Sequence, residues 1–304
     1  MGYRRNAARK KKRNALTNGN DAEQVLEITN PTFNQAPAHI AANARFKFLV
    51  PKRDTHRGRV LAICGAGPSL KDQYQRLMSG YDVWACNSAL IWLADRGVPI
   101  TRGCAIEMSD IMLHTWRNAP VVPYLLASCV HPHLILGLLQ RGVTDIVMFH
   151  NFLGFGDNEF KMYAAYPETI VAGMGLNVVN RLIQVGDYMG YDRIDVFGAD
   201  CALGEDGAWH MDGSTGDKRQ ILTATINGRK WATFFDMAYS AGALVWQKRV
   251  LRNRLRIIGN TMPAAILADP RYKRDPDRFL QLLPSFNDKD RDDWKTAMRA
   301  GRVS

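Results

Sequence analysis

Residues 59–70 read Arg-Val-Leu-Ala-Ile-Cys-Gly-Ala-Gly-Pro-Ser-Leu, and this stretch decides the fold. Its apolar run, Val60–Cys64, predicts a buried parallel strand. The glycine turn that follows, 65–67, allows a sharp bend and a close approach of the backbone to a ligand. Pro68 and Ser69 suit the first positions of a helix. A strand, a glycine turn and a helix N-terminus together predict a phosphate site, because free N–H groups and the helix dipole favour anions.

The glycine turn does not match the two best-known nucleotide motifs. The dinucleotide fingerprint requires a third Gly or Ala where this chain has Leu70. A Walker loop requires Gly-Lys-Ser/Thr, which does not follow here. The alternative interpretation is a tight strand-to-helix turn that binds nothing.

Composition indicates a globular protein. The 304 residues are 46% hydrophobic and 23% charged, which is enough for a full core in one large or two small domains. No run approaches the ~20 apolar residues of a membrane span, and the charged N-terminus lacks the apolar stretch of a secretory signal. The five cysteines lack zinc-like spacing and predict buried free thiols. We therefore expect a cytoplasmic protein with no membrane partner.

The net charge of +11 is concentrated at the N-terminus. Residues 1–13 contain seven Lys and Arg residues, and the first acidic residue is Asp21. Such an arm predicts contact with nucleic acid or another polyanion. A solvated tail without a partner is the alternative.

Strands and helices alternate from residue 58 to 268, which predicts an α/β, Rossmann-like domain with a mainly parallel sheet and helices on both faces. Residues 1–45 predict a basic flexible arm, and 270–304 predict a charged C-terminal tail. The expected strands are 60–64, 82–86, 103–107, 121–126, 145–149, 193–197 and 255–258. The expected helices are 21–28, 70–78, 88–96, 111–116, 132–141, 173–189, 231–251 and 263–268.

A polar, glycine-rich stretch at about 199–230 predicts a functional lid, because structureless loops of this length are uncommon inside compact domains. Its Asn227-Gly228 pair predicts a hairpin turn. Arg229 and Lys230 follow this turn and are candidate phosphate ligands, or else solvated turn residues. His210 lies in the lid between two nearby acidic residues, which suits a general base with a tuned pKa; a surface histidine paired with an acid is the alternative.

Polar residues follow several of the predicted strands. In open parallel sheets, ligands bind beyond the carboxyl ends of the strands. The residues at those ends are Gly65–Ser69, Asn87, Glu107–Asp110, His150-Asn151 and Asp200.

Four segments in this order carry a family resemblance: 64–70, 82–87, 173–200 and 255–267. Together they resemble the superfamily shared by small Rossmann-like bacterial sialyltransferases and hydroxymethylpterin diphosphokinase-like proteins, which has phage members. The resemblance covers about residues 58–268 and implies a nucleotide-binding transferase. It implies that the nucleotide of a cytidine monophosphate sugar donor is held by Gly65, Ala66, Gly67, Pro68, Ser69 and Asn87.

The sequence departs from the sialyltransferases at one important position. These enzymes place a catalytic histidine just before the helix equivalent to 231–251, where this chain has Gly228-Arg229-Lys230. The nearest candidate is His210, earlier in the lid. We therefore expect Asp200 and His210 to act near the acceptor.

The diphosphokinase-like branch implies ATP and magnesium, which carboxylates near the phosphates would hold. Glu107 and Asp110, with Asp200, are the candidate metal ligands. Capping of the next helix is the alternative role for Asp110. A capping or solvent-exposed role is expected for the His131-Pro-His133 pair, rather than metal binding.

Three functions follow from these observations. The first is glycosyl transfer from a nucleotide-sugar donor to a hydroxyl acceptor. The second is ATP- and magnesium-dependent diphosphate transfer. The third is a non-catalytic scaffold that binds a nucleotide, or nucleic acid through the basic arm.

Overall fold

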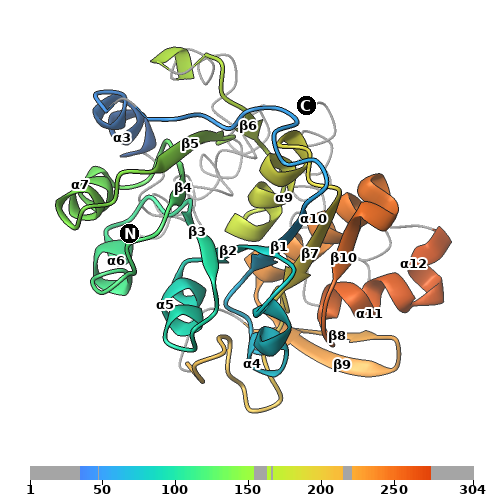
Figure 1. Ribbon diagram of the computed structural model, residues 1–304. Coiled ribbons are helices and arrows are strands. Elements are labelled where there is room, and N and C mark those ends of the chain that lie inside the picture. The colour runs from blue at the N-terminus through green and yellow to red at the C-terminus, as the bar shows by residue number, and fades with distance from the viewer. Residues whose placement is uncertain (1–34, 47, 154–162, 166, 215–220, 275–304) are drawn as a thin grey trace, which may run out of the picture.

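A single parallel sheet organises the chain (Figure 1). The computed structural model describes residues 35–274 except 47, 154–162, 166 and 215–220. The strand order in the sheet is β10-β7-β1-β2-β3-β4-β5-β6, and every neighbouring pair is parallel. Its strands are β1 (Val60–Cys64), β2 (Asp82–Cys86), β3 (Ile100–Ala105), β4 (Tyr124–Ala127), β5 (Ile146–Asn151), β6 (Val171–Ala172), β7 (Arg193–Phe197) and β10 (Leu255–Ile257).

Helices cover both faces of the sheet, which confirms the predicted Rossmann-like α/β class (Figure 1). The first group connects β1 to β5 and runs along one face: α4 (Leu70–Gln73) with η3 (Tyr74–Leu77), α5 (Ser88–Ala94), α6 (Ile111–Thr115) and α7 (Pro132–Gln140). The second group contains α9 (Val178–Tyr188) and α10 (Phe235–Leu251). On the other face, α9 contacts β6, β1 and β7.

The chain reverses direction at β1. Strands β2 to β6 extend the sheet on one side of β1, and β7 and β10 extend it on the other side. Two neighbouring strands whose connections leave in opposite directions form a topological switch point, where open sheets bind their ligands. In this protein the switch point lies between the carboxyl ends of β1 and β7.

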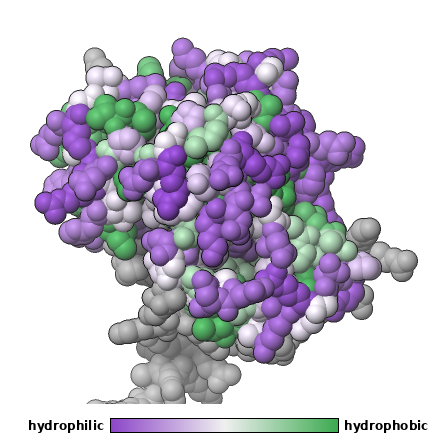
Figure 2. Space-filling view, turned by 60° about the horizontal axis from the view of Figure 1, so that its bottom comes forward, coloured by the Kyte–Doolittle hydropathy of each residue, from purple (hydrophilic) through white to green (hydrophobic). Residues whose placement is uncertain are grey.

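The smaller structural elements complete the described chain. They are α3 (Ala36–Asn43), η4 (Tyr163–Ala165), the hairpin β8 (Leu222–Ile226) and β9 (Arg229–Thr233), η5 (Arg252–Arg254), α11 (Met262–Ala268) and α12 (Pro270–Arg274). The hairpin and α10–α12 share a second buried apolar cluster, separate from the main core. None of the described helices is long and apolar enough to cross a membrane. On the face in Figure 2, hydrophilic residues dominate and hydrophobic residues form separate patches.

The predicted hairpin is present, but the predicted helix 231–251 is wrong at its start. Arg229–Thr233 forms β9, and α10 begins only at Phe235. Trp231 is therefore a strand residue, paired with Ala224 across the hairpin and buried with it. The aromatic residues at 231, 234 and 235 are spaced as on one face of a helix, but the chain changes from strand to helix between 231 and 235.

Three other elements begin or end at residues that differ from the predicted ones. The fourth strand begins at Tyr124 rather than 121, because Pro120 and Pro123 have no N–H to donate to a ladder. The third strand begins at Ile100 and ends before Glu107. The helix predicted from 173 begins at Val178, where Asn177 caps it by accepting a hydrogen bond from the backbone N–H of residue 180.

The predicted arms are only partly described. Residues 36–43 of the basic arm form α3, which packs on α7, and residues 270–274 of the tail form α12. The rest of both arms, the predicted helix 21–28 and the basic residues of 1–13 lie outside the described residues. All five cysteines are buried and free, as predicted.

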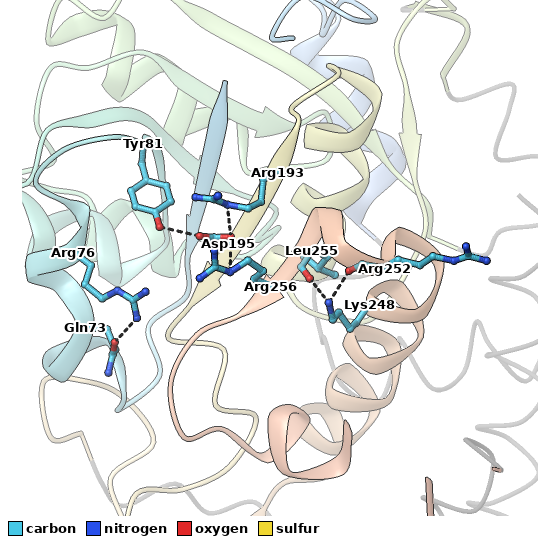
Figure 3. A network of polar contacts seen from close by, with 9 residues as sticks. All are labelled: Gln73, Arg76, Tyr81, Arg193, Asp195, Lys248, Arg252, Leu255 and Arg256. Carbon is cyan, nitrogen blue, oxygen red and sulfur yellow. Dashed lines mark hydrogen bonds and ion pairs between the residues drawn. The ribbon is translucent and has the colours of Figure 1, made fainter. Parts of the chain in front are cut away.

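A buried carboxylate stabilises the β7–β10 edge (Figure 3). Asp195 is fully buried and accepts a hydrogen bond from the Tyr81 hydroxyl at 2.8 Å. The Arg193 and Arg256 guanidinium groups lie 3.1 and 3.6 Å from the same carboxylate. A buried charge without partners is strongly unfavourable, so these neighbours allow Asp195 to remain in the sheet. Nearby, Lys248 donates to the carbonyls of Arg252 and Leu255 at the end of α10.

Close packing under β3 generates a stability prediction. A Cβ added at Gly103 would lie 2.6 Å from the Tyr124 ring and 2.9 Å from Leu90, so Gly103→Ala should destabilise the fold by about 1–3 kcal/mol. Gly137 in α7 has open space around it, so Gly137→Ala should stabilise by roughly 0.5–1 kcal/mol. Urea denaturation of both variants checks the pair. Equal effects of the two substitutions would contradict the packing.

Candidate functional site at the sheet switch point

Two turns meet at the switch point. The glycine turn after β1 donates from Gly65 N–H to the Phe197 carbonyl at 2.9 Å and from Gly67 N–H to the Gly198 carbonyl at 2.8 Å. A Cβ at Gly65 or Gly67 would lie 2.6 Å from the Gly198 carbonyl oxygen. Glycine is required at 65 and 67 because one backbone docks directly on another.

This docking changes the role expected for the turn. The N–H groups of Gly65, Gly67, Ser69 and Leu70 all donate to acceptors within the protein, so the predicted row of free donors is already satisfied. Ala66, Gly67 and Ser69 remain half-buried, whereas Gly65 and Pro68 are buried. A ligand would therefore approach the exposed side of Ala66, Gly67 and Ser69.

Asp200 occupies the place predicted for an anion. Its Oδ2 accepts hydrogen bonds from the Ser69 N–H at 3.1 Å and the Ser69 hydroxyl at 2.9 Å. Only 8% of Asp200 is exposed. Burial raises the pKa of Asp200 to about 6, although the two Ser69 hydrogen bonds lower it. A carboxyl that titrates near neutral pH at a sheet switch point is typical of functional sites.

Asn87 lies one strand away at the carboxyl end of β2. Its backbone has φ 47° and ψ −124°, a conformation that L residues rarely adopt. Its N–H donates to the Cys104 carbonyl at 3.0 Å, and its own carbonyl accepts from the Trp116 indole at 2.8 Å. Among the residues that the structure describes, the buried Asn87 amide oxygen has no hydrogen-bond partner. Strained backbone and an unsatisfied polar atom both indicate a residue kept for a ligand.

The lid is attached to the glycine turn. The Met211 N–H donates to the Ala66 carbonyl at 2.9 Å, which places His210 beside the turn. His210 is half-buried, and its ring stacks on Trp209 with 4.2 Å between ring centroids. Asp212 accepts from the Ser214 N–H and hydroxyl. The structure thus brings the predicted catalytic segment against the predicted nucleotide site.

The two basic candidates differ in their surroundings. The Arg229 guanidinium lies 3.2 Å from the Glu205 carboxylate and 4.2 Å from the centre of the Trp231 ring. Lys230 is exposed. Arg229 is therefore linked to the lid through Glu205.

The acidic candidates do not form a cluster. Glu107 accepts from the Ser109 N–H at 2.9 Å, and Asp110 is exposed. Across the described parts of the chain, no three His, Cys, Asp or Glu side chains gather in a way that could hold a metal ion. Asp110 precedes α6 but makes no side-chain cap, because its own backbone is already helical. His131 does cap α7, accepting from the His133 N–H at 3.2 Å.

Some site residues could not be inferred from the sequence. Trp116 is buried at the end of α6 and reaches Asn87 across 29 positions of sequence. The Ser128 hydroxyl meets the His150 ring at 2.8 Å beneath the same rim. The position of residue 150 at the end of a predicted strand could have indicated a residue near the site, but no sequence feature indicated Trp116.

The comparisons with known proteins rest on structure. No protein-family model matches the chain, and no curated protein matches it in sequence. The fold is similar to that of the MAf glycosyltransferase from Magnetospirillum magneticum AMB-1, with a TM-score of 0.56 and 13% identity. The alignment covers 84% of this chain but only 44% of the glycosyltransferase. This likeness establishes the shared fold.

Two sialyltransferases are more distant. A mammalian sialyltransferase in complex with Gal-beta-1-3GalNAc-ortho-nitrophenol has a TM-score of 0.36 and 15% identity, over 66% of this chain and 69% of that one. CstII from Campylobacter jejuni, in complex with a substrate analogue, cytidine-5'-monophosphate, has a TM-score of 0.32 and 16% identity, over 68% and 82%. These two likenesses are too loose to support an argument.

The Asp200 carboxyl predicts a pH-dependent stability. Because folding raises its pKa from 3.8 to about 6, its contribution to stability is present below about pH 4 and is lost as the pH rises through about 6. Asp200→Asn keeps an oxygen for Ser69 but carries no charge. At pH 8 it should be more stable than the wild type by on the order of 2–3 kcal/mol, with little difference at pH 4. Urea denaturation across this range measures the effect.

Asp212→Asn is the matched control in the same lid. Burial acts to raise the Asp212 pKa, but hydrogen bonds from Ser214 outweigh it and lower the pKa overall. This substitution should therefore reduce stability at neutral pH, and the loss should vanish toward acid. A wild type that is more stable than Asp200→Asn at pH 8 would contradict the account of Asp200.

Proposed function

We propose that this protein transfers a sugar from a nucleotide-sugar donor to a hydroxyl acceptor. The observation that carries the proposal is the switch point itself, where a glycine turn, a buried carboxyl with a pKa of about 6 and a histidine-bearing lid meet. The fold shared with a glycosyltransferase supports it. Because this chain spans less than half of that enzyme, its activity does not transfer automatically.

The donor nucleotide lies along the exposed side of Ala66, Gly67 and Ser69, with Asn87 beside it. Its phosphate approaches the Asp200 carboxylate, and two negative charges at close range repel each other. Donor binding is therefore coupled to protonation of Asp200. Arg229 can add positive charge if it exchanges Glu205 for the donor phosphate.

The transfer step forms a bond between the acceptor oxygen and the anomeric carbon while the bond from that carbon to the phosphate oxygen breaks. His210 takes the proton of the acceptor hydroxyl as the general base. The nucleotide leaves with the bonding electron pair, and nearby cations stabilise its charge. Glycosyl transfer is preferred over magnesium-dependent diphosphate transfer because the solved structure with which the fold is shared is a glycosyltransferase.

Donor affinity should depend on pH through Asp200. An anionic donor raises the carboxyl pKa above about 6, so affinity should be highest below pH 6 and fall about tenfold by pH 8. Cytidine monophosphate sugars and uridine diphosphate sugars suit this test, because their esterified phosphates keep a constant charge over the range. Isothermal titration calorimetry should show a flat profile for Asp200→Asn. An equally flat profile for the wild type would contradict the coupling.

Donor hydrolysis tests the proposed base without knowledge of the acceptor. With a panel of sugar nucleotides, the wild type should release nucleotide slowly, and His210→Gln should reduce the rate about 100-fold. His114→Gln removes an exposed histidine on α6 and should have no effect. Chromatography of the released nucleotide, with and without magnesium, gives the rates. Phosphate transfer from ATP only, with magnesium required, would overturn glycosyl transfer.

A further inference from the structure

Asn87 is held in an unfavourable backbone conformation. Glycine adopts the pair φ 47°, ψ −124° readily, whereas this backbone conformation is strained for a residue with a side chain. Such a conformation persists only where the surroundings fix it. The contacts that fix it are therefore as important to the position of the side chain as Asn87 itself.

Three hydrogen bonds hold the backbone N–H and carbonyl of Asn87. The backbone N–H donates to the Cys104 carbonyl of β3 at 3.0 Å, continuing the sheet. The carbonyl accepts from the Trp116 indole N–H at 2.8 Å, in addition to the first helical bond from Leu90 at 3.2 Å. Of these three contacts, only the indole bond comes from a side chain.

Trp116 is itself rigidly placed. Only 1% of the residue is exposed, and its ring packs on Tyr124 with 5.3 Å between ring centroids. The Arg141 guanidinium donates to the Trp116 carbonyl at 2.5 Å. These contacts hold the indole N–H in place next to the carboxyl end of β2.

The Asn87 side chain lies where an external group could bind. Within the described residues, its amide oxygen is buried without a hydrogen-bond partner, and so is the hydroxyl of the adjacent Ser88. Unsatisfied buried polar atoms are costly, and two at neighbouring positions indicate a place for an external hydrogen-bonding group. Both atoms lie where β2 passes into α5, on the strand next to β1.

We infer that Trp116 is a positioning residue for the nucleotide site, and that it acts by locking Asn87 through the indole hydrogen bond. The inference rests on the proposed function, in which Asn87 contacts the donor. Trp116 touches no donor group itself. Its removal should therefore weaken binding only while the Asn87 side chain is present.

A double-mutant cycle tests this dependence. Trp116→Phe keeps an aromatic ring but removes the N–H, and should raise the Kd for the sugar nucleotide about five- to tenfold, the effect of one lost hydrogen bond. Asn87→Gly should also weaken binding, while raising the melting temperature because glycine relieves the strain. Adding Trp116→Phe to Asn87→Gly should change the Kd less than twofold. Calorimetric titration gives all four values.

Trp246→Phe is the matched control, since this half-buried ring on α10 packs against the second apolar cluster whereas Trp116 belongs to the main core, and its change should leave the Kd unchanged. If Trp116→Phe does not fold, Arg141→Gln replaces it in the cycle, because Arg141 fixes the Trp116 carbonyl. An equal loss of affinity in the wild-type and Asn87→Gly backgrounds would overturn the positioning role alone. Absence of binding by the wild type to every sugar nucleotide would overturn the proposed function and this inference with it.

Discussion

The contact between two turns at the centre of the sheet is the constraint on which the rest of this structure depends. Gly67 donates to the Gly198 carbonyl, and Ser69 donates twice to Asp200. These bonds join the carboxyl ends of β1 and β7, where the chain changes direction across the sheet. The start of α4 and the anchor of the lid at Ala66 both take their positions from this contact.

The same contact makes the ionised form of Asp200 unfavourable for the stability of the fold. Its burial beside the turn raises its pKa to about 6, so the ionised carboxyl weakens the folded state at neutral pH. An asparagine could accept the same hydrogen bonds without this cost. We propose that a ligand whose binding or reaction uses its proton accounts for a carboxyl at this position, in keeping with the general trade-off between stability and function.

The sequence predicts local features of this protein better than distant ones. Strands 60–64, 82–86 and 193–197 are confirmed at both ends. The first is a continuous apolar run between Arg59 and Gly65, whereas the third contains Arg193 and Asp195 among its apolar residues. The need for glycine at 67 was predicted, but for a ligand rather than for a second turn. The partner of Ser69 lies 131 positions away, and no periodicity or spacing reports such a contact. The indole bond to Asn87 escaped prediction for the same reason.

Amide chemical-shift mapping tests most directly whether a sugar nucleotide binds at the switch point. In ¹H–¹⁵N spectra of the full chain, titration of the donor should shift the amide signals of Ala66, Gly67, Ser69 and Asn87 first and most. Signals of α7 should barely move, because this helix joins β4 and β5, which lie three and four strands from β1. Shifts confined to the basic residues 1–13, or no shifts at all, would contradict a donor site at the glycine turn.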